Sequence, residues 1–445
     1  MRIHLIASLL VASTSLVAAQ PADPAPTPTD QTAPPPTTPT TEPTPPAEGP
    51  VTTPEHPPDV PAKPPEEKPA VSATYDGGLK LESADGEYEL KLQFRNQLRF
   101  ESVRDLDGNQ FINKFYIPRS RLQAEGYVFG KGNRYKLEFG LGDAGSFSFV
   151  KDLFIDKNLA DAPVWLRLGM WKRPFNRAEM VSDFASTFNE RSIQNELAGG
   201  GRDLGIAVHN DYEKSPEGIE WVAGVFNQFS GGKERPDLGG AVAANCVTNP
   251  ATGAVTCKDT RPTNFPADFS PAVVLRAAWN SAKMKGYSEG DLEGGPLRYS
   301  VGLAYKIDLA NFSPGSKPTW GENISHGLEL DTLVKVEGFQ VHVGGVLMKL
   351  KTDGPFYGVF AQPGYFLVPK KDELALRFAY VTGGLDKADL DRDSIEARLA
   401  YTHFFHGHTF KLASDAGFVQ KLGTDMAGAS DKPDLMLRVM MQLSI

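Results

Sequence analysis

Residues 90–100 have the sequence Leu90-Lys91-Leu92-Gln93-Phe94-Arg95-Asn96-Gln97-Leu98-Arg99-Phe100, and their alternation decides the fold. Apolar side chains occupy every second position from Leu90, and polar ones lie between them, with Asn96 as the exception. Successive side chains of a β-strand point to opposite faces, so this stretch predicts a strand with one apolar and one polar face. It is longer than the strands of about 5–6 residues in soluble sheets. Its length is typical of a transmembrane β-barrel, whose strands have about ten residues.

The same alternation returns along residues 71–445, which show no sustained helical period. It is clear in residues 273–280, 297–306, 373–380 and 435–445, and Glu337-Gly338 separates two further runs as a tight hairpin turn. A soluble β-sandwich or propeller also alternates, but with shorter strands. The pattern predicts an all-β, transmembrane antiparallel barrel of sixteen strands, starting near residues 88, 112, 133, 146, 163, 202, 219, 271, 296, 325, 339, 356, 373, 394, 408 and 433.

Composition excludes several other classes of protein. The chain has 445 residues, 2 cysteines, and 46 Lys and Arg against 55 Asp and Glu. Too few cysteines are present for a small disulfide scaffold, and the acidic balance argues against a nucleic-acid binder. The mean hydropathy of −0.30 and the single short apolar run at the N-terminus exclude a helical membrane protein. A barrel wall alternates, so its average hydropathy stays near zero, and the barrel remains compatible with these numbers.

The first part of the chain has a different character from the barrel. Residues 1–19 have Arg2, an apolar run and a small-residue end at Ala19, which predicts a cleaved secretory signal; an uncleaved helical anchor is the alternative. Residues 21–70 contain 19 of the 35 prolines and no aromatic residue. Such a segment cannot form a core, so we expect a disordered Pro/Thr-rich linker over 20–74 and the barrel over 75–445.

The predicted connections between strands differ in length. Short turns alternate with long polar insertions at 230–270, 281–295 and 307–325. Outer-membrane barrels have short periplasmic turns and longer outer loops, so we expect these insertions to be outer loops. The N-terminal linker is then expected in the periplasm, as a plain tail or in contact with peptidoglycan or a periplasmic partner.

The stretch after the fifth predicted strand resembles the phosphate-selective porins O and P. The matching residues are Leu168-Gly169-Met170-Trp171-Lys172-Arg173-Pro174-Phe175-Asn176-Arg177-Ala178-Glu179-Met180-Val181-Ser182, then Phe188-Asn189-Glu190-Arg191-Ser192 and Gly201-Arg202-Asp203-Leu204-Gly205. His408 and Lys411, within 401–415, are similar to a late family motif, whereas Asn176-Arg177-Ala178 departs from the usual Gly-Leu. The resemblance implies a trimeric, sixteen-stranded outer-membrane porin in lipid and lipopolysaccharide, whose third loop, here 171–201, folds inward as a constriction loop after strand 5.

Arginine dominates the candidate site. Its guanidinium keeps its charge and has a planar fork that matches phosphate and carboxylate oxygens, so rows of Arg can pass an anion from site to site. By the resemblance, the constriction-loop candidates are Lys172, Arg173, Arg177, Arg191 and Arg202. The pore-wall candidates on the polar face are Arg95, Arg99, Arg119, Arg121, Arg167, Arg276, Arg298, Arg377, Arg398 and Arg438.

These residues predict passive diffusion of small hydrophilic solutes, with anions and phosphate as the candidates. The alternative is that the arginines pair with carboxylates, giving a non-selective structural porin. The carboxylates that share the polar face are Glu125, Glu138, Glu329, Asp331 and Glu396. An outer-membrane barrel enzyme of lipase or protease type is a further alternative, although no nucleophile elbow, P-loop or HExxH motif is present.

Two smaller motifs complete the sequence predictions. Cys246 and Cys257 lie in one loop, and in an oxidising compartment they predict a local disulfide. His403, His406 and His408 have metal-ligand spacing, but strands flank them on both sides, so we expect a turn there. The sequence predicts neither a cofactor nor a metal site.

Overall fold

The computed structural model describes residues 70–106, 110–142, 150–159, 162–198, 201–227, 245–248, 255–258, 271–311, 319–349, 355–383, 393–424 and 432–445. The predicted signal, 1–19, and nearly all of the predicted linker, 20–74, lie outside these residues. Strand β1 (Val71–Tyr75) begins inside the last residues of that predicted linker. No helix in the described part of the chain is long and apolar enough to cross a membrane.

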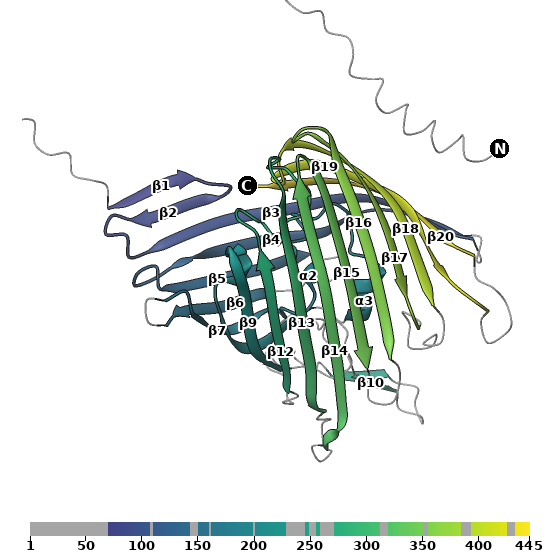
Figure 1. Ribbon diagram of the computed structural model, residues 1–445, viewed down its shortest axis with the longest axis horizontal. Helices are drawn as coiled ribbons and strands as arrows, with labels where there is room; N and C mark the ends of the chain where they lie inside the picture. The colour runs from purple at the N-terminus through teal and green to yellow at the C-terminus, as the bar shows by residue number, and fades with distance from the viewer. Residues whose placement is uncertain are drawn as a thin grey trace, which may run out of the picture. The chain divides into compact units, whose positions relative to one another are not determined.

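Sixteen of the described strands form a closed antiparallel barrel, as the sequence predicts (Figure 1). The last strand pairs with the first, from Leu435 opposite Arg104 to Ser444 opposite Arg95. The barrel strands are β3 (Glu89–Asp105), β4 (Gln110–Tyr127), β5 (Asn133–Gly142), β6 (Val150–Asn158), β7 (Trp165–Lys172), β8 (Arg202–His209), β9 (Gly218–Asn227), β12 (Pro271–Asn280), β13 (Arg298–Asn311), β14 (Thr319–Val336), β15 (Phe339–Lys349), β16 (Phe356–Val368), β17 (Asp372–Val381), β18 (Ser394–His406), β19 (Phe410–Lys421) and β20 (Asp434–Ser444).

Most of the predicted strand starts lie close to the observed ones. The largest differences are at β6, which begins at Val150 rather than 146, and at β14, which begins at Thr319 rather than 325. The Glu337-Gly338 turn is confirmed, with φ of 47° and 87°. Both angles are positive, as in the type I′ turn that favours hairpins, and Gly338 takes this conformation without a Cβ clash. The predicted insertion at 307–325 is shorter than expected because β13 and β14 extend into it.

The connections define two ends of the barrel. At the turn end, where β20 finishes, the connections include 128–132, 210–217, 337–338 and 407–409. The other end, the loop end, has the connections 173–201 and 228–270. The 281–297 connection joins β12 to β13 at the turn end, so its assignment to the outer loops was wrong. Alternation of strand direction around the barrel fixes this placement.

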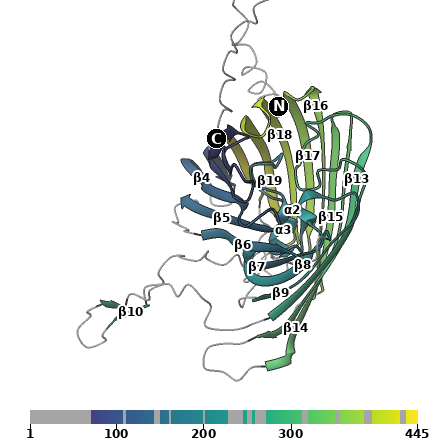
Figure 2. The ribbon, with the colours of Figure 1, turned by 90° about the vertical axis from the view of Figure 1, so that its left-hand side faces the viewer.

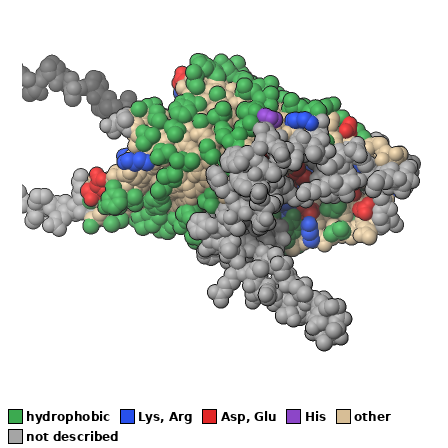
Figure 3. Space-filling model, turned by 90° about the horizontal axis from the view of Figure 1, so that it is seen from below, with side chains coloured by type: hydrophobic (Ala, Val, Ile, Leu, Met, Phe, Trp, Pro, Cys, Tyr) green, Lys and Arg blue, Asp and Glu red, His purple; other side chains and the backbone are tan. Residues whose placement is uncertain are grey.

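The wall has the two faces that alternation predicts. In β3, Leu98 and Phe100 are exposed on the outer surface, whereas Gln97 and Arg99 are buried on the inner face. The outer surface repeats this along the barrel, with Leu275, Leu303, Leu330 and Phe378 among its exposed side chains. Figure 3 shows hydrophobic side chains spread widely over the described surface, with few charged ones among them. The barrel therefore has an apolar exterior and a polar interior.

Two hairpins lie outside the sixteen-strand ring. β1 pairs with β2 (Leu79–Ser83), and β2 pairs with the first residues of β3, Glu89–Leu92. β20 pairs with β3 only from Arg95 onward, so β2 extends the sheet beyond the end of β20. β10 (Asn245–Thr248) and β11 (Val255–Lys258) pair with each other as a separate two-stranded sheet.

The 173–201 segment follows β7, the fifth strand of the barrel, and contains two short helices. In α2 (Arg177–Met180) the Asn176 side chain caps the first turn by accepting from the Glu179 amide. α3 (Ile193–Ala198) lies against β15–β18, and Figure 2 shows both helices on the concave side of these strands. Phe175 joins a buried apolar cluster with Trp171 and Phe226, whose rings are 5.0 Å apart.

Candidate functional site

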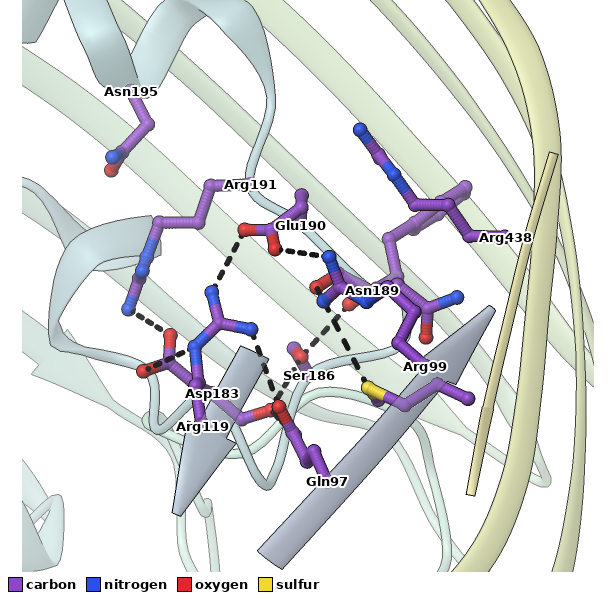
Figure 4. A network of polar contacts seen from close by, with 12 residues as sticks. Gln97, Arg99, Arg119, Asp183, Ser186, Asn189, Glu190, Arg191, Asn195 and Arg438 are labelled. Atoms are coloured by element: carbon purple, nitrogen blue, oxygen red, sulfur yellow. Dashed lines mark hydrogen bonds and ion pairs between the residues drawn. The ribbon is translucent and has the colours of Figure 1, made fainter. Parts of the chain in front are cut away.

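Two arginines of β3 and β4 bind the 173–201 segment through its carboxylates (Figure 4). Arg99 Nη1 donates to Glu190 Oε1 at 2.6 Å, and Arg119 Nη2 donates to Glu190 Oε2 at 2.8 Å. Arg119 also pairs with Asp183 at 3.2 Å, and Asp183 pairs with Arg191 at 2.8 Å. One network therefore joins three of the predicted pore arginines to two of the carboxylates of the segment, Asp183 and Glu190.

The charged state of these carboxylates is stabilised by the arginines. Burial alone would raise the pKa of Glu190, but the Arg119 and Arg99 guanidiniums outweigh it and lower the pKa to about 2. Arg119, Arg191 and Lys172 likewise hold the pKa of Asp183 well below its ordinary value against the effect of burial. Both groups are ionised at neutral pH, so the ion pairs are intact there.

The segment is also fixed to strands on other parts of the wall. The Asn189 amide donates to Asp415 at 3.1 Å, and the Ile193 amide donates to Glu396 at 2.8 Å. Arg377 of β17 donates to the Glu190 carbonyl oxygen at 2.7 Å. Contacts with β3, β4, β17, β18 and β19 place residues 183–193 among the inner faces of these strands.

A polar cavity of about 270 Å³ lies between the segment and strands β3–β8. This volume is large enough to hold several water molecules. Its lining includes the cations Arg95, Arg121, Lys136, Lys172 and Arg202 and the anions Glu138, Asp152, Asp183 and Glu213. Five cations face four anions, so the formal charge of the lining is +1.

The cavity charges form a chain of contacts across neighbouring strands. Arg202 of β8 pairs with Asp152 of β6 at 2.7 Å and with Glu138 of β5 at 3.4 Å. Lys136 pairs with Asp152 at 3.3 Å, and Arg95 pairs with Glu138. Cations and anions therefore alternate along this part of the wall, and the fork of Arg202 spans two strands.

The five predicted constriction-loop candidates lie in different surroundings. Arg202 belongs to the cavity wall, as described above. Lys172 lines the cavity and donates to the Glu179 and Val181 carbonyl oxygens at 2.6 and 3.0 Å. Arg191 lines a smaller cavity beside Glu190. Arg173 is buried 3.7 Å from Asp203, and Arg177 is buried against Asp331 of β14. Lys172, at the end of β7, therefore faces the cavity, whereas Arg177 of the segment faces β14.

The remaining wall arginines pair with carboxylates, as in the alternative of paired arginines. Arg167 binds Asp156 at 2.7 Å, and Arg276 binds Asp331 at 2.7 Å and Glu329 at 3.3 Å. Arg298 pairs with Asp291, Arg377 and Arg398 with Glu396, and Arg438 with Glu101. Of the predicted carboxylate partners, Glu125 instead accepts from Gln123 at 2.8 Å.

Sequence reasoning missed two parts of this interior. Lys136 lies on the polar face of β5 and lines the cavity, and alternation with Leu137 signals its direction. The sequence prediction names only arginines on the wall and therefore does not include this lysine. The 281–297 connection also contributes Tyr287 to the cavity lining, and its turn-end position was not foreseen.

The two minor motifs have different outcomes. In the histidine motif, His403 and His406 lie in β18 and His408 lies in the turn before β19. Asp372 Oδ1 accepts from His403 at 2.7 Å, while His408 lies 3.3 Å from Ser288. No group of three metal-ligating side chains occurs among the described residues. Cys246 and Cys257 are opposite each other in the β10–β11 register. Their side chains lie outside the described part of the molecule, and the disulfide stays a prediction.

Comparisons with known proteins bear on the fold of the chain. No family model matches the chain, and no curated protein matches it. Among solved structures, the outer membrane channel DcaP of Acinetobacter baumannii has a TM-score of 0.51 at 12% identity, over 82% of this chain and 99% of that one. At this identity the similarity shows that the two chains share a fold.

Two further solved structures have lower scores. An anion-selective porin from Comamonas acidovorans has a TM-score of 0.49 at 14% identity, over 81% of this chain and 100% of that one. A BenF-like porin from Pseudomonas fluorescens has a TM-score of 0.42 at 10% identity, over 80% and 98%. The similarity to phosphate-selective porins in particular stays a prediction.

Proposed function

We propose that this protein is a passive diffusion channel of the bacterial outer membrane for small hydrophilic solutes, with a preference for anions. The observation that carries the proposal is a charged cavity, large enough for several water molecules, inside a closed barrel whose exterior is apolar. An apolar outer band suits lipid, and a polar interior suits water. Passage needs neither energy input nor catalysis.

The anion preference rests on the cavity lining. Arg95, Arg121, Lys136, Lys172 and Arg202 supply positive groups along one side of the interior. An anion that leaves its hydration shell can be received by successive N–H donors of these residues. Phosphate fits this donor chemistry, and we propose it as a candidate solute. The 173–201 segment is then the inward-folded constriction loop of the pore.

A non-selective channel is the second candidate, because four of the five lining cations pair with a carboxylate. These are Arg95, Arg121, Lys136 and Arg202. Paired charges weaken the field that a passing ion experiences. Reversal potential in a KCl gradient across a planar bilayer separates the two. Chloride preference, with block of the current by added phosphate, is the expected result. Cation preference would overturn the anion proposal, and folded protein that does not conduct would overturn the channel.

The N-terminal segments and the assembly of the protein have proposed roles that follow from the same function. Residues 1–19 are a signal cleaved after Ala19, and residues 20–70 form a periplasmic linker before strand β1. The mass of the mature protein tests the first, since cleavage removes residues 1–19. The proposed assembly is a homotrimer in contact with lipid and lipopolysaccharide, and crosslinking in native membranes tests it.

A further inference from the structure

The 281–297 connection, here called the turn-end insert, folds into the barrel instead of extending from its rim. Short turns such as 337–338 and 369–371 connect other strands at this end. The insert contains Glu289 and Asp291, which are 4% and 1% exposed. Two carboxylates that are almost completely buried in one connection require partners inside the barrel, because an unpaired buried charge is strongly unfavourable.

Arg298 of β13 pairs with Asp291, and four further strands of the wall hold the insert. Glu289 Oε1 lies 3.1 Å from His342 Nδ1 of β15, and Gln362 Nε2 of β16 donates to Glu289 Oε2 at 3.0 Å. Lys335 Nζ of β14 donates to the Ser288 carbonyl oxygen at 2.7 Å. Tyr287 Oη donates to Glu220 of β9. The insert is therefore attached to the inner face from β9 to β16.

The insert also meets the 173–201 segment, which enters from the opposite end. The Thr187 amide donates to Glu289 Oε2 at 2.9 Å, and the Glu289 amide donates to the Ala185 carbonyl oxygen at 2.9 Å. Arg177 Nη1 donates to the Gly286 carbonyl oxygen at 2.8 Å. Two connections from opposite ends of the barrel thus form one continuous internal layer.

This layer covers the inner face of β14–β17 and leaves a cavity on the β3–β8 side of the interior. On β14–β17 the polar side chains Lys335, Gln340 and Glu373 are at most 1% exposed. On the β3–β8 side, the 270 Å³ cavity remains, and Tyr287 is the residue of the insert that lines it. The polar inner face of β14–β17 has the composition of a channel wall but is covered by protein.

We propose that the turn-end insert is a second constriction element, which closes the β14–β17 side of the barrel and confines solutes to the cavity along β3–β8. The inference rests on the proposed channel function. The cross-section of the pore is then set jointly by the 173–201 segment and the insert, and Tyr287 forms part of the boundary of the open side.

Shortening the insert tests the proposal. Residues 283–295 are replaced by Gly-Asn-Gly, and a matched control shortens the loop-end connection 384–392 in the same way. Single-channel conductance of the insert variant is expected to rise about two-fold or more, because a second water-filled path opens beside the first. Its exclusion limit for polyethylene glycols rises with it, while the control keeps the conductance of the full chain. Unchanged conductance in a folded insert variant would overturn the proposal.

Thiol accessibility gives a test that does not depend on conduction or on a deletion. In the full chain with Cys246→Ser and Cys257→Ser, Gln340→Cys is expected to resist a membrane-impermeant thiol reagent, whereas Lys136→Cys reacts. Adding Glu289→Ala removes the hydrogen bonds to His342 and Thr187 and should expose position 340. The reaction rate at position 340 should then rise about ten-fold or more, a factor that corresponds to a loss of about 1.4 kcal/mol in the free energy that holds the insert on the wall. Equal reactivity of positions 340 and 136 in the full chain would refute the closure.

The two proposals fail in distinguishable ways. If the full chain does not conduct but the shortened variant does, the channel proposal fails and the insert is supported as the blocking element. If neither conducts, the channel proposal fails, and the thiol comparison alone decides on the insert. If both conduct equally, the channel stands and the insert proposal is wrong.

Discussion

The Arg177 guanidinium donates a hydrogen bond to the Gly286 carbonyl oxygen at 2.8 Å, and this contact joins two connections that enter the barrel from opposite ends. The same guanidinium pairs with Asp331 of β14 and donates to Ser300 of β13 at 2.7 Å. One fully buried side chain thus ties the 173–201 segment to the insert and to the wall.

Replacing Arg177 by Met should destabilise the protein by about 3–5 kcal/mol, because it leaves buried partners without their donor. The measurement is the free energy of unfolding by urea in lipid vesicles. Arg134→Met is the matched control: Arg134 pairs with Asp211 at 2.9 Å near the barrel rim, where both side chains are partly exposed. Such a pair contributes up to about 1 kcal/mol. Similar losses in the two variants would contradict the role given to Arg177.

Lys136→Gln should weaken the anion preference of the channel. The substitution takes the formal charge of the cavity lining from +1 to 0 and leaves Asp152 paired with Arg202. A unit charge about 4 Å away changes the energy of an ion in water by about 1 kcal/mol, which is a factor of about five in its local concentration. The reversal potential in a KCl gradient should therefore move toward that of an unselective pore.

The control for Lys136 is Lys371→Gln, which removes the same charge from an exposed turn between β16 and β17. Its reversal potential should equal that of the unmodified protein. A shift of equal size in both variants would mean that overall charge, and not the cavity lining, determines selectivity.

Acid should loosen the 173–201 segment only well below neutral pH. The pKa of Glu190 is lowered to about 2 in the folded protein, whereas an unperturbed Glu has a pKa of about 4.3. A lowered pKa stabilises the fold above the unfolded value, and this stabilisation is lost as the pH falls toward 2. The difference in unfolding free energy between the unmodified protein and Glu190→Gln should be constant from pH 7 to about 5. It should shrink between about pH 4 and 2.

A change in that difference between pH 7 and 5 would contradict the pairing of Glu190 with Arg99 and Arg119. Glu289→Gln provides an independent comparison, because burial raises its pKa but His342 and the Thr187 amide lower it to about 2 overall. The same pH window is therefore expected for the insert. Both connections should remain docked from pH 7 down to about 5.

The alternation of apolar and polar residues is sufficient to predict the barrel but not the arrangement of the side chains inside it. Leu98 and Arg99 could be assigned to opposite faces from the sequence alone, because a strand has a period of two residues. The end of the barrel that 281–297 occupies follows from the predicted strand count, because the strands near 271 and 296 are the eighth and ninth of sixteen. That this connection folds into the barrel could not be assigned, since no local pattern states it. Contacts such as Arg177 with Asp331 join residues far apart in the sequence and depend on the closed ring.

The candidate arginines show the same limit. Their side chains were correctly expected on the polar face, but the sequence did not distinguish Arg202, which lines the cavity, from Arg276, which is buried against Asp331 and Glu329. Whether an arginine lines the cavity or is buried depends on the internal layer, which is formed by the 173–201 segment and the insert. Lys136 is not among the predicted residues because the prediction considered only arginines, although the position of Lys136 on the polar face of β5 could have indicated it.

The β10–β11 hairpin should contain a disulfide between Cys246 and Cys257. The two residues are directly opposite in an antiparallel pair, where Cα atoms are about 4.5–5.5 Å apart, within the range of about 4.4–6.8 Å that a disulfide spans. Intact mass after alkylation should show no added group before reduction and two added groups after it; two free thiols without reduction would refute the bond. The hairpin pairs with itself and not with the barrel. Cys246→Ser should therefore change the unfolding free energy of the barrel by less than about 1 kcal/mol.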